Sequence, residues 1–253
     1  MRIIALLPGR YQPFHKGHKA NYDFLVKTFG DQNVYVATSD SQAPLTSPFT
    51  FVDKEMMMNK LGIPVSKIIK SKNPYVAEEF VDEIQDKDNT ALIIAISKKD
   101  MGDNPRFTFG KRKDGKLTYL QPMPKKLKDM KPMSEHAYVL VTPVTKFRIR
   151  GIDADSASAI RKIYMKGSDE DRDQIIADLY GESYPDIKEV FDHKIGNIKK
   201  AQKYISELRE KITTSKGKSR LKMIALLESV VDLEHSVDIK QTEEVVEDYI
   251  NEV

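Results

Sequence analysis

The chain has 253 residues, of which 40% are hydrophobic, enough for a buried core in one large domain or in a medium domain joined to a smaller one. Its 41 Lys and Arg nearly balance 38 Asp and Glu, and a net charge of +3 is too small to indicate nucleic-acid binding. There is no cysteine, so disulfides and thiolate metal sites are excluded.

The hydropathy pattern indicates where the chain resides. No apolar run approaches the roughly 20 residues of a membrane-spanning helix, and the first residues lack the basic, apolar and small-residue segments of a signal peptide. We therefore expect a soluble, cytoplasmic protein without membrane contact. The few histidines show no ligand spacing beyond His15 and His18, so we expect no metal site built from side chains.

The first strand and the first helix are predicted at the start of the chain. Residues 2–7 are a short apolar run with β-branched residues, followed by the turn signal Pro8-Gly9, which favours a buried strand. Apolar side chains then recur at helical spacing, so we expect a helix to begin near Lys16. Between them lies the segment 9–18, with the sequence GRYQPFHKGH.

This strand-to-helix junction has the features of a phosphate site. Unpaired N–H groups and the positive end of the helix dipole attract an anion there. His15 and His18, three residues apart, can face the same side of the first turn. Gly17 removes a Cβ that would keep a ligand from the backbone, and Gly9 permits the tight turn. The alternative is a pair of surface or capping histidines.

The same segment resembles the HxGH signature of the nucleotidyltransferase superfamily. Its amino-acid sequence is similar to the GRFQPxHxGH form of this signature in archaeal-type nicotinamide mononucleotide (NMN) adenylyltransferases. The resemblance implies that His15 and His18 are catalytic, holding the α-phosphate of a nucleotide and stabilising developing charge. It implies supporting roles, in binding and in backbone access, for Gly9, Arg10, Lys16 and Gly17.

Further strands and helices are predicted to alternate along the chain. The later strands are 33–38, 66–70, 90–96 and 137–141, and the helices between them are 50–61 and 75–85. This order predicts an α/β fold, a Rossmann-like parallel sheet with helices on both faces. Ligands bind outside the carboxyl ends of such strands, where His15 and His18 lie. Ser47 or Thr50 is expected to cap the helix at 50–61.

The regular alternation of predicted strands and helices stops between the strands at 90–96 and 137–141. Asp114-Gly115 between two alternating segments predicts a hairpin, and residues 121–132 are expected to be irregular and exposed. We interpret 103–133 as a basic hairpin insertion that contacts an anionic acceptor or a macromolecule. The alternative is a solvated loop that adds charge for solubility. Nucleic acid is not the expected partner, because the segment has few aromatics and no known module pattern.

A second candidate motif follows a predicted linker at 146–151. Asp155 or Ser156 can cap a new helix, whose free N–H groups and the Ser158 hydroxyl can hold phosphate oxygens. Arg161, one turn later, can reach the same anion. The segment resembles the superfamily's ISSTxIR signature, from which Asp155 and Ala157 depart. The resemblance implies that Arg161 is catalytic and that it holds the β- and γ-phosphates together with Ser156 and Ser158.

The remainder of the chain is predicted to be helical. A helix is expected at 169–179, and from residue 184 a stripe of apolar residues at 187–212 is followed by helical segments at 221–233 and 245–249. We expect a nucleotidyltransferase domain at 1–183 and a helical C-terminal region at 184–253. That region either forms an interior hairpin or joins copies into a homo-oligomer.

Together the two phrases imply transfer of an adenylyl group from ATP to a phosphate-bearing acceptor, with release of pyrophosphate. The acceptor phosphate is already ionised, so no protein nucleophile or base is required. Mg²⁺ (magnesium) would neutralise the triphosphate. The resemblance makes NMN the leading acceptor, giving NAD. The alternatives are a phosphopantetheine adenylyltransferase, a cytidylyltransferase, or a non-catalytic nucleotide-binding assembly protein.

Overall fold

The computed structural model describes residues 1–43, 45–102, 105–111, 113, 115–143, 145, 147–154, 156–214 and 216–232. Predictions that fall on Asp114, Lys146, Asp155 and the helix expected at 245–249 lie outside these residues.

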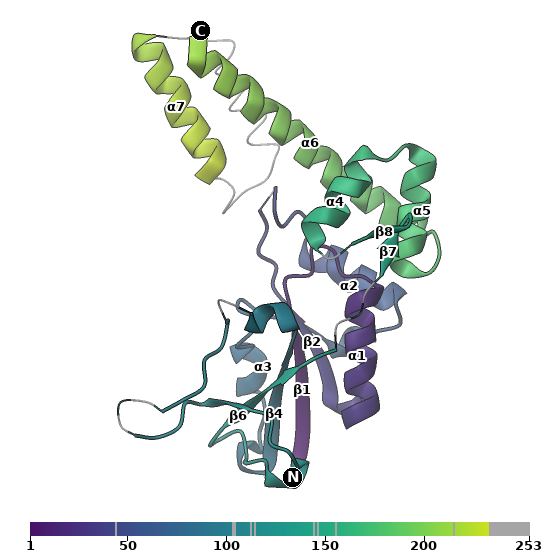
Figure 1. The fold of residues 1–253 in the computed structure, drawn as a ribbon, viewed down its shortest axis with the longest axis vertical. Helices are drawn as coiled ribbons and strands as arrows, with labels where there is room; N and C mark the ends of the chain where they lie inside the picture. Colours follow the sequence, from purple (N-terminus) through teal and green to yellow (C-terminus); the bar gives the residue numbers. More distant parts are fainter. Residues whose placement is uncertain are drawn as a thin grey trace. The chain divides into compact units, whose positions relative to one another are not determined.

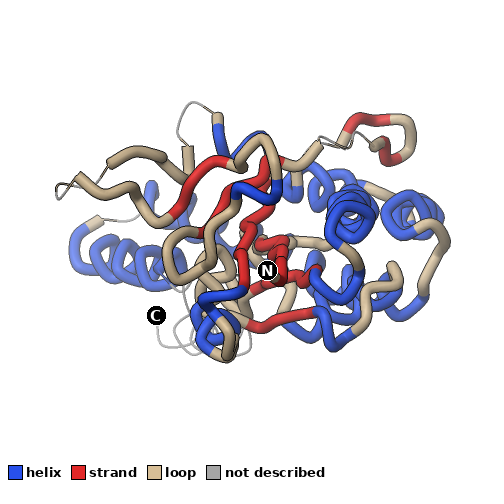
Figure 2. The backbone as a smooth tube through the Cα atoms, turned by 90° about the horizontal axis from the view of Figure 1, so that it is seen from below, coloured by secondary structure: helices blue, strands red, loops and turns tan. Residues whose placement is uncertain are grey.

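A six-stranded sheet organises the first half of the chain (Figure 1). Its strands are β1 (Arg2–Pro8), β2 (Val34–Thr38), β3 (Ile68–Lys70), β4 (Thr90–Ile96), β5 (Leu120–Pro122) and β6 (Ala137–Val141). They lie in the order β3-β2-β1-β4-β6-β5, and every neighbouring pair is parallel. Figure 2 shows these strands, in red, side by side as one twisted layer. The predicted parallel α/β fold is confirmed.

The described chain also contains α-helices and one short hairpin, besides a few 3-10 turns. The helices are α1 (Lys16–Phe29), α2 (Phe51–Lys60), α3 (Glu78–Asp82), α4 (Ala157–Lys166), α5 (Asp169–Tyr180), α6 (Pro185–Thr214) and α7 (Gly217–Asp232), and the hairpin pairs β7 (Arg148–Ile149) with β8 (Ile152–Asp153). Thr50 caps α2, since its N–H donates to Asp53 and its hydroxyl accepts from the Asp53 N–H. None of the described helices is both long enough and apolar enough to cross a bilayer.

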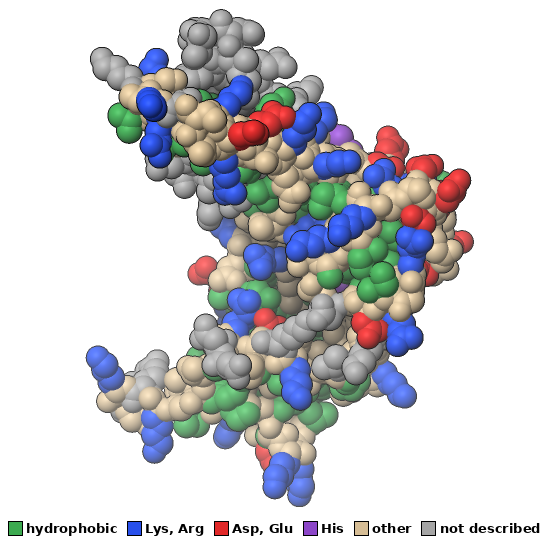
Figure 3. All heavy atoms as spheres, turned by 45° about the horizontal axis from the view of Figure 1, so that its top comes forward, with side chains coloured by type: hydrophobic (Ala, Val, Ile, Leu, Met, Phe, Trp, Pro, Cys, Tyr) green, Lys and Arg blue, Asp and Glu red, His purple; other side chains and the backbone are tan. Residues whose placement is uncertain are grey.

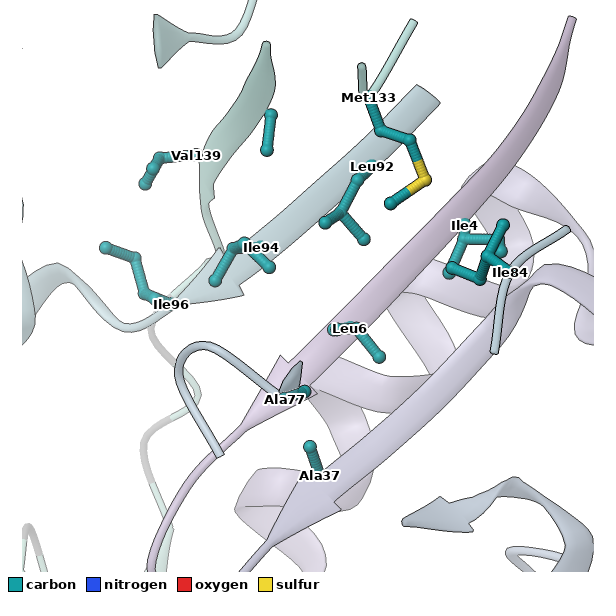
Figure 4. Packing of buried hydrophobic residues seen from close by; sticks show 11 residues of the cluster. Ile4, Leu6, Ala37, Ala77, Ile84, Leu92, Ile94, Ile96, Met133 and Val139 are labelled. Carbon is teal, nitrogen blue, oxygen red and sulfur yellow. The ribbon is translucent and has the colours of Figure 1, made fainter. Parts of the chain in front are cut away.

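The central strand β1 buries side chains on both faces of the sheet. Ile4 and Leu6 point to one face, where they meet Ala77 and Ile84 from the α3 region (Figure 4). The alternate residues of β1 point to the other face, where α1 lies against β1 and β2 and buries Leu25. The carboxyl end of β1, where α1 begins, is therefore held rigidly from both sides.

The described chain forms two compact units. The first consists of residues 1–40 and 55–147, and the second of residues 41–54 together with those from 148 onward. This division differs from the predicted boundary between residues 183 and 184. It places α4 and α5 with the long helix α6 rather than with the sheet.

Polar contacts explain why α4 and α5 belong with α6. The hydroxyl of Tyr164 on α4 donates to Asp192 of α6 at 3.0 Å, and Arg172 of α5 pairs with the same carboxylate at 3.0 Å. Lys188 of α6 reaches Asp169 of α5 at 2.9 Å. Farther along, α7 packs against α6 within the chain. Assembly of copies through this region stays a prediction.

The helix expected at 75–85 is shorter than predicted. Asn73 closes a turn ahead of it, accepting from the Tyr75 N–H through its side chain at 3.2 Å and from the Ala77 N–H through its carbonyl at 2.8 Å. Ala77 then adopts φ 47°, in the left-handed region, which interrupts the helical run. As a result α3 spans only Glu78–Asp82.

Two other segments depart from the prediction. Part of the stretch expected to be irregular, 121–132, joins the sheet as β5, and its Met130 is buried. The predicted linker at 146–151 instead enters the hairpin of β7 and β8, whose turn residues Arg150 and Gly151 both have positive φ, as two-residue hairpin turns require.

The basic segment before β5 shows the antiparallel pairing predicted for it. Lys111 forms a bridge with Leu117, and the Thr118 N–H donates to the Gly110 carbonyl at 2.9 Å. Lys111, Lys113 and Lys116 are exposed. Figure 3 shows Lys and Arg side chains along the segment that projects from the sheet.

The packing of β1 predicts a large cost for truncating Leu6, which has no exposed surface. We expect Leu6→Ala to lower the free energy of unfolding by about 2–5 kcal/mol, through lost apolar contact and the cavity left behind. The half-exposed Leu127 gives the matched control, and Leu127→Ala should cost less than about 1 kcal/mol. Urea unfolding followed by circular dichroism measures both, and equal losses would contradict this account of the core.

Candidate active site

The loop after β1 is shaped by a tyrosine folded back over a glycine. The Gly9 N–H donates to the Ala37 carbonyl of β2 at 3.0 Å, which ties the loop to the carboxyl edge of the sheet. Tyr11 has φ 49°, and its hydroxyl donates to the Leu7 carbonyl at 2.8 Å. A Cβ on Gly9 would lie 2.6 Å from the Tyr11 ring, so only glycine fits beneath it.

His15 is the cap of α1. Its Nδ1 accepts from the Gly17 N–H at 3.1 Å, and its carbonyl accepts from the His18 N–H at 2.8 Å. A Cβ on Gly17 would lie 2.9 Å from Cε1 of His15 and 3.1 Å from the Phe147 ring. The helix therefore begins at Lys16, as predicted, with His15 as its cap and with glycine favoured at position 17 by local packing.

The two imidazoles stack inside a wall of aromatic rings. The ring centroids of His15 and His18 are 3.8 Å apart at an interplanar angle of 33°. Phe147 lies 4.5 Å from the His15 ring, and Tyr11 and Phe14 lie 4.9 and 5.3 Å from the His18 ring. His15 is buried, and in the described part of the chain the buried Nδ1 of His18 has no hydrogen-bond partner.

This environment keeps both histidines neutral near pH 7. Burial lowers the pKa of His18 to about 4. Burial also holds the pKa of His15 well below its ordinary value, with further lowering from the nearby charges of His18 and Lys16. Because Nδ1 of His15 accepts a hydrogen bond, the neutral ring carries its proton on Nε2. The pair therefore offers hydrogen-bond donors without a fixed charge.

The remaining predicted residues divide between the two units. Arg10 is exposed and Lys16 is partly exposed, beside the histidine pair in the first unit. In the second unit Ser156 caps α4, accepting from the Ala159 N–H at 3.2 Å, and its hydroxyl lies 3.3 Å from that of Ser158. Arg161 is buried on the same helix. The predicted capping role of Ser156 is confirmed.

Sequence reasoning missed the aromatic wall and a cluster beside it. Tyr11, Phe14 and Phe147 carried no motif signal of their own, although the first two lie inside the GRYQPFHKGH phrase. Asp100 and Arg106 pair at 3.2 Å in the loop that follows β4. No motif or spacing in that loop predicts this pair.

Protein ligands for a metal ion are not apparent. Among the residues that the structure describes, no three His, Asp or Glu side chains come together as a metal site would require. The donors near the histidine pair are imidazoles, backbone N–H groups and a guanidinium, which suit anions rather than cations. A cation that acts here would have to be held mainly by the ligand's own oxygens.

Comparisons with known proteins identify a family for this region. The profile described as Cytidylyltransferase-like matches residues 6–143, from β1 to the end of β6. The nicotinamide-nucleotide adenylyltransferase of Sulfurisphaera tokodaii is 32% identical over 56 residues, which are 22% of this chain and 33% of that protein. The chain thus matches only a third of that relative's length.

Two solved structures are similar in backbone. One is the bifunctional NMN adenylyltransferase/ADP ribose pyrophosphatase of Francisella tularensis, complexed with AMP and a Mn ion, with a TM-score of 0.47 and 15% identity over 86% of this chain and 58% of that chain. The other is the nicotinic acid mononucleotide adenylyltransferase of Plasmodium falciparum, complexed with APC, with a TM-score of 0.41 and 13% identity over 78% of this chain and 96% of that chain.

The neutral histidines predict an acid-sensitive fold. Below pH 6.5 the unfolded chain protonates His18, whereas the folded chain resists protonation until about pH 4. The unfolded state then binds more protons, so stability should fall as the pH drops through this window and level off below it. We expect the urea midpoint of His18→Gln to depend less on pH between 6.5 and 4 than that of the wild type. Parallel pH profiles would contradict the lowered pKa.

Proposed function

Because this chain belongs to the cytidylyltransferase-like family, we propose that it transfers an adenylyl group from ATP to the phosphate of NMN, giving NAD and pyrophosphate. The observation that carries the proposal is the stacked, neutral pair of His15 and His18 at the first strand-to-helix junction. The choice of NMN is supported by the GRYQPFHKGH phrase and by the partial match to a nicotinamide-nucleotide adenylyltransferase.

The proposed reaction exchanges one phosphoanhydride bond for another. An oxygen of the acceptor phosphate attacks the α-phosphorus of ATP, and the bond from that phosphorus to the oxygen bridging to the β-phosphate breaks. Pyrophosphate leaves with the bonding electrons. A phosphate monoester is largely ionised at pH 7, since its second pKa is about 6, so the nucleophile needs no base from the protein. The protein's part is to orient the groups and stabilise charge.

The histidine pair suits the α-phosphate. A neutral imidazole donates through Nε2–H, and a nearby anion raises the pKa of a histidine because it favours the charged form. As negative charge builds on the oxygens of the α-phosphate, the hydrogen bonds that His15 and His18 donate to them can become stronger. The aromatic wall of Tyr11, Phe14 and Phe147 keeps water away from the pair and so strengthens this response.

We propose supporting roles for the other predicted residues. Gly9 and Gly17 keep the backbone open to the ligand, with Arg10 and Lys16 as nearby cations. The start of α4, with Ser156, Ser158 and Arg161, is assigned to the β- and γ-phosphates on the strength of its likeness to ISSTxIR. Mg²⁺ would enter as its complex with ATP, because the described side chains form no cage for it.

Pyrophosphate release tests the proposal directly. With ATP and NMN we expect turnover, and His18→Ala should lower kcat by about a hundredfold to a thousandfold, as loss of a charge-stabilising donor does. The exposed His193 on α6 supplies the control, and His193→Ala should leave kcat unchanged. Release with phosphopantetheine, or from CTP with an alcohol phosphate, would keep the mechanism and change the substrate. No release with any acceptor, with nucleotide binding retained, would favour the non-catalytic assembly protein.

A further inference from the structure

A second cluster of side chains lies at the same edge of the sheet as the histidine pair. Tyr75 follows β3, Asp100 and Arg106 follow β4, and Arg10 follows β1. These strands are parallel, so their carboxyl ends share one edge. Tyr75 also packs against the core cluster that contains Leu6.

Arg106 is held in one orientation by contacts on two sides. The centre of its guanidinium lies 3.8 Å from the centroid of the Tyr75 ring, a cation–π contact. Its Nε pairs with Oδ1 of Asp100 at 3.2 Å. The other carboxylate oxygen of Asp100 accepts from the Ser97 hydroxyl at 2.7 Å, at the end of β4. A long, flexible side chain is thereby pre-organised.

The outer end of Arg106 remains available. Asp100 engages Nε, and in the described part of the chain no acceptor engages the two Nη groups. The side chain is 43% exposed, so these groups reach solvent. Two parallel N–H donors with a fixed orientation match the geometry of a phosphate or carboxylate.

The chemistry of the proposed reaction favours such a cation beside the acceptor phosphate. It brings the acceptor phosphate against the α-phosphate of ATP, and the neutral His15 and His18 supply no fixed charge to offset the repulsion. The cluster lies close to that pair. Tyr11, which packs on His18, has its phenol pKa raised by burial and by the nearby Tyr75 and Asp100. Burial, with the nearby Asp100, raises the pKa of the Tyr75 phenol, and the nearby charges of Arg106 and Arg10 partly offset this rise.

We infer that Arg106, oriented by Tyr75 and Asp100, binds the phosphate of the acceptor and selects phosphate-bearing acceptors over dephosphorylated ones. This inference rests on the proposed function for the identity of the acceptor, but phosphate binding at Arg106 can be tested without turnover. Arg106 lies outside both the GRYQPFHKGH phrase and the ISSTxIR-like phrase.

Binding measured by calorimetry, without turnover, tests the assignment. Arg106→Met, which keeps an apolar stem but removes the guanidinium, should weaken NMN binding about tenfold to a hundredfold, the value of a charged hydrogen-bonding contact. Binding of nicotinamide riboside, which lacks the phosphate, and of ATP should be unchanged. Arg106→Lys, which keeps the charge but loses the fork, should fall between wild type and Arg106→Met.

Arg148 provides the matched control, since it pairs with Asp153 at 2.9 Å on an exposed surface of the second unit. Arg148→Met should leave all three affinities unchanged. An equal loss for NMN and the riboside, no loss for either, or a wild-type chain that binds neither NMN nor inorganic phosphate would overturn the inference. If no acceptor yields pyrophosphate but phosphate binding still depends on Arg106, the proposed function fails and the phosphate site stands.

Discussion

Two imidazole rings with centroids 3.8 Å apart cannot both be positively charged in a shielded site without strong repulsion, and the side chains around them fit this constraint. Tyr11 folds over Gly9 and reaches His18, while Phe147 lies on His15. The pair is thereby shielded and neutral. Fixed positive charge must then come from other side chains, among them Arg10, Lys16 and, in our proposal, Arg106 on the same edge of the sheet.

The sequence predicts the elements that place this pair. The predicted limits of β4 at Thr90–Ile96 and of β6 at Ala137–Val141 agree with the structure, because both are continuous apolar runs. The start of α1 at Lys16 was also predicted, since the strand, the turn and the helical spacing agree there. The resemblance to the nucleotidyltransferase superfamily is confirmed by the match over residues 6–143.

Features that depend on contacts across the fold could not be predicted. β5 has only three residues, and it exists because β6 offers an open edge. α3 is short because Ala77 adopts a left-handed conformation, which an alanine in the sequence does not predict. The contact of Arg106 with Tyr75 joins residues that lie far apart in the chain. The same is true of the contact between His15 and Phe147, the last residue of the first unit. Only the sheet brings such residues together.

The hydrogen bond from the Gly17 N–H to Nδ1 of His15 has a consequence for measurements of nucleotide affinity. A ring that accepts at one nitrogen and carries its proton on the other can gain a second proton only by breaking the helix cap. Proton uptake on nucleotide binding should therefore fall mainly on His18, whose Nδ1 makes no such bond within the described chain. The heat of binding would then vary with the ionisation enthalpy of the buffer, in proportion to the protons taken up.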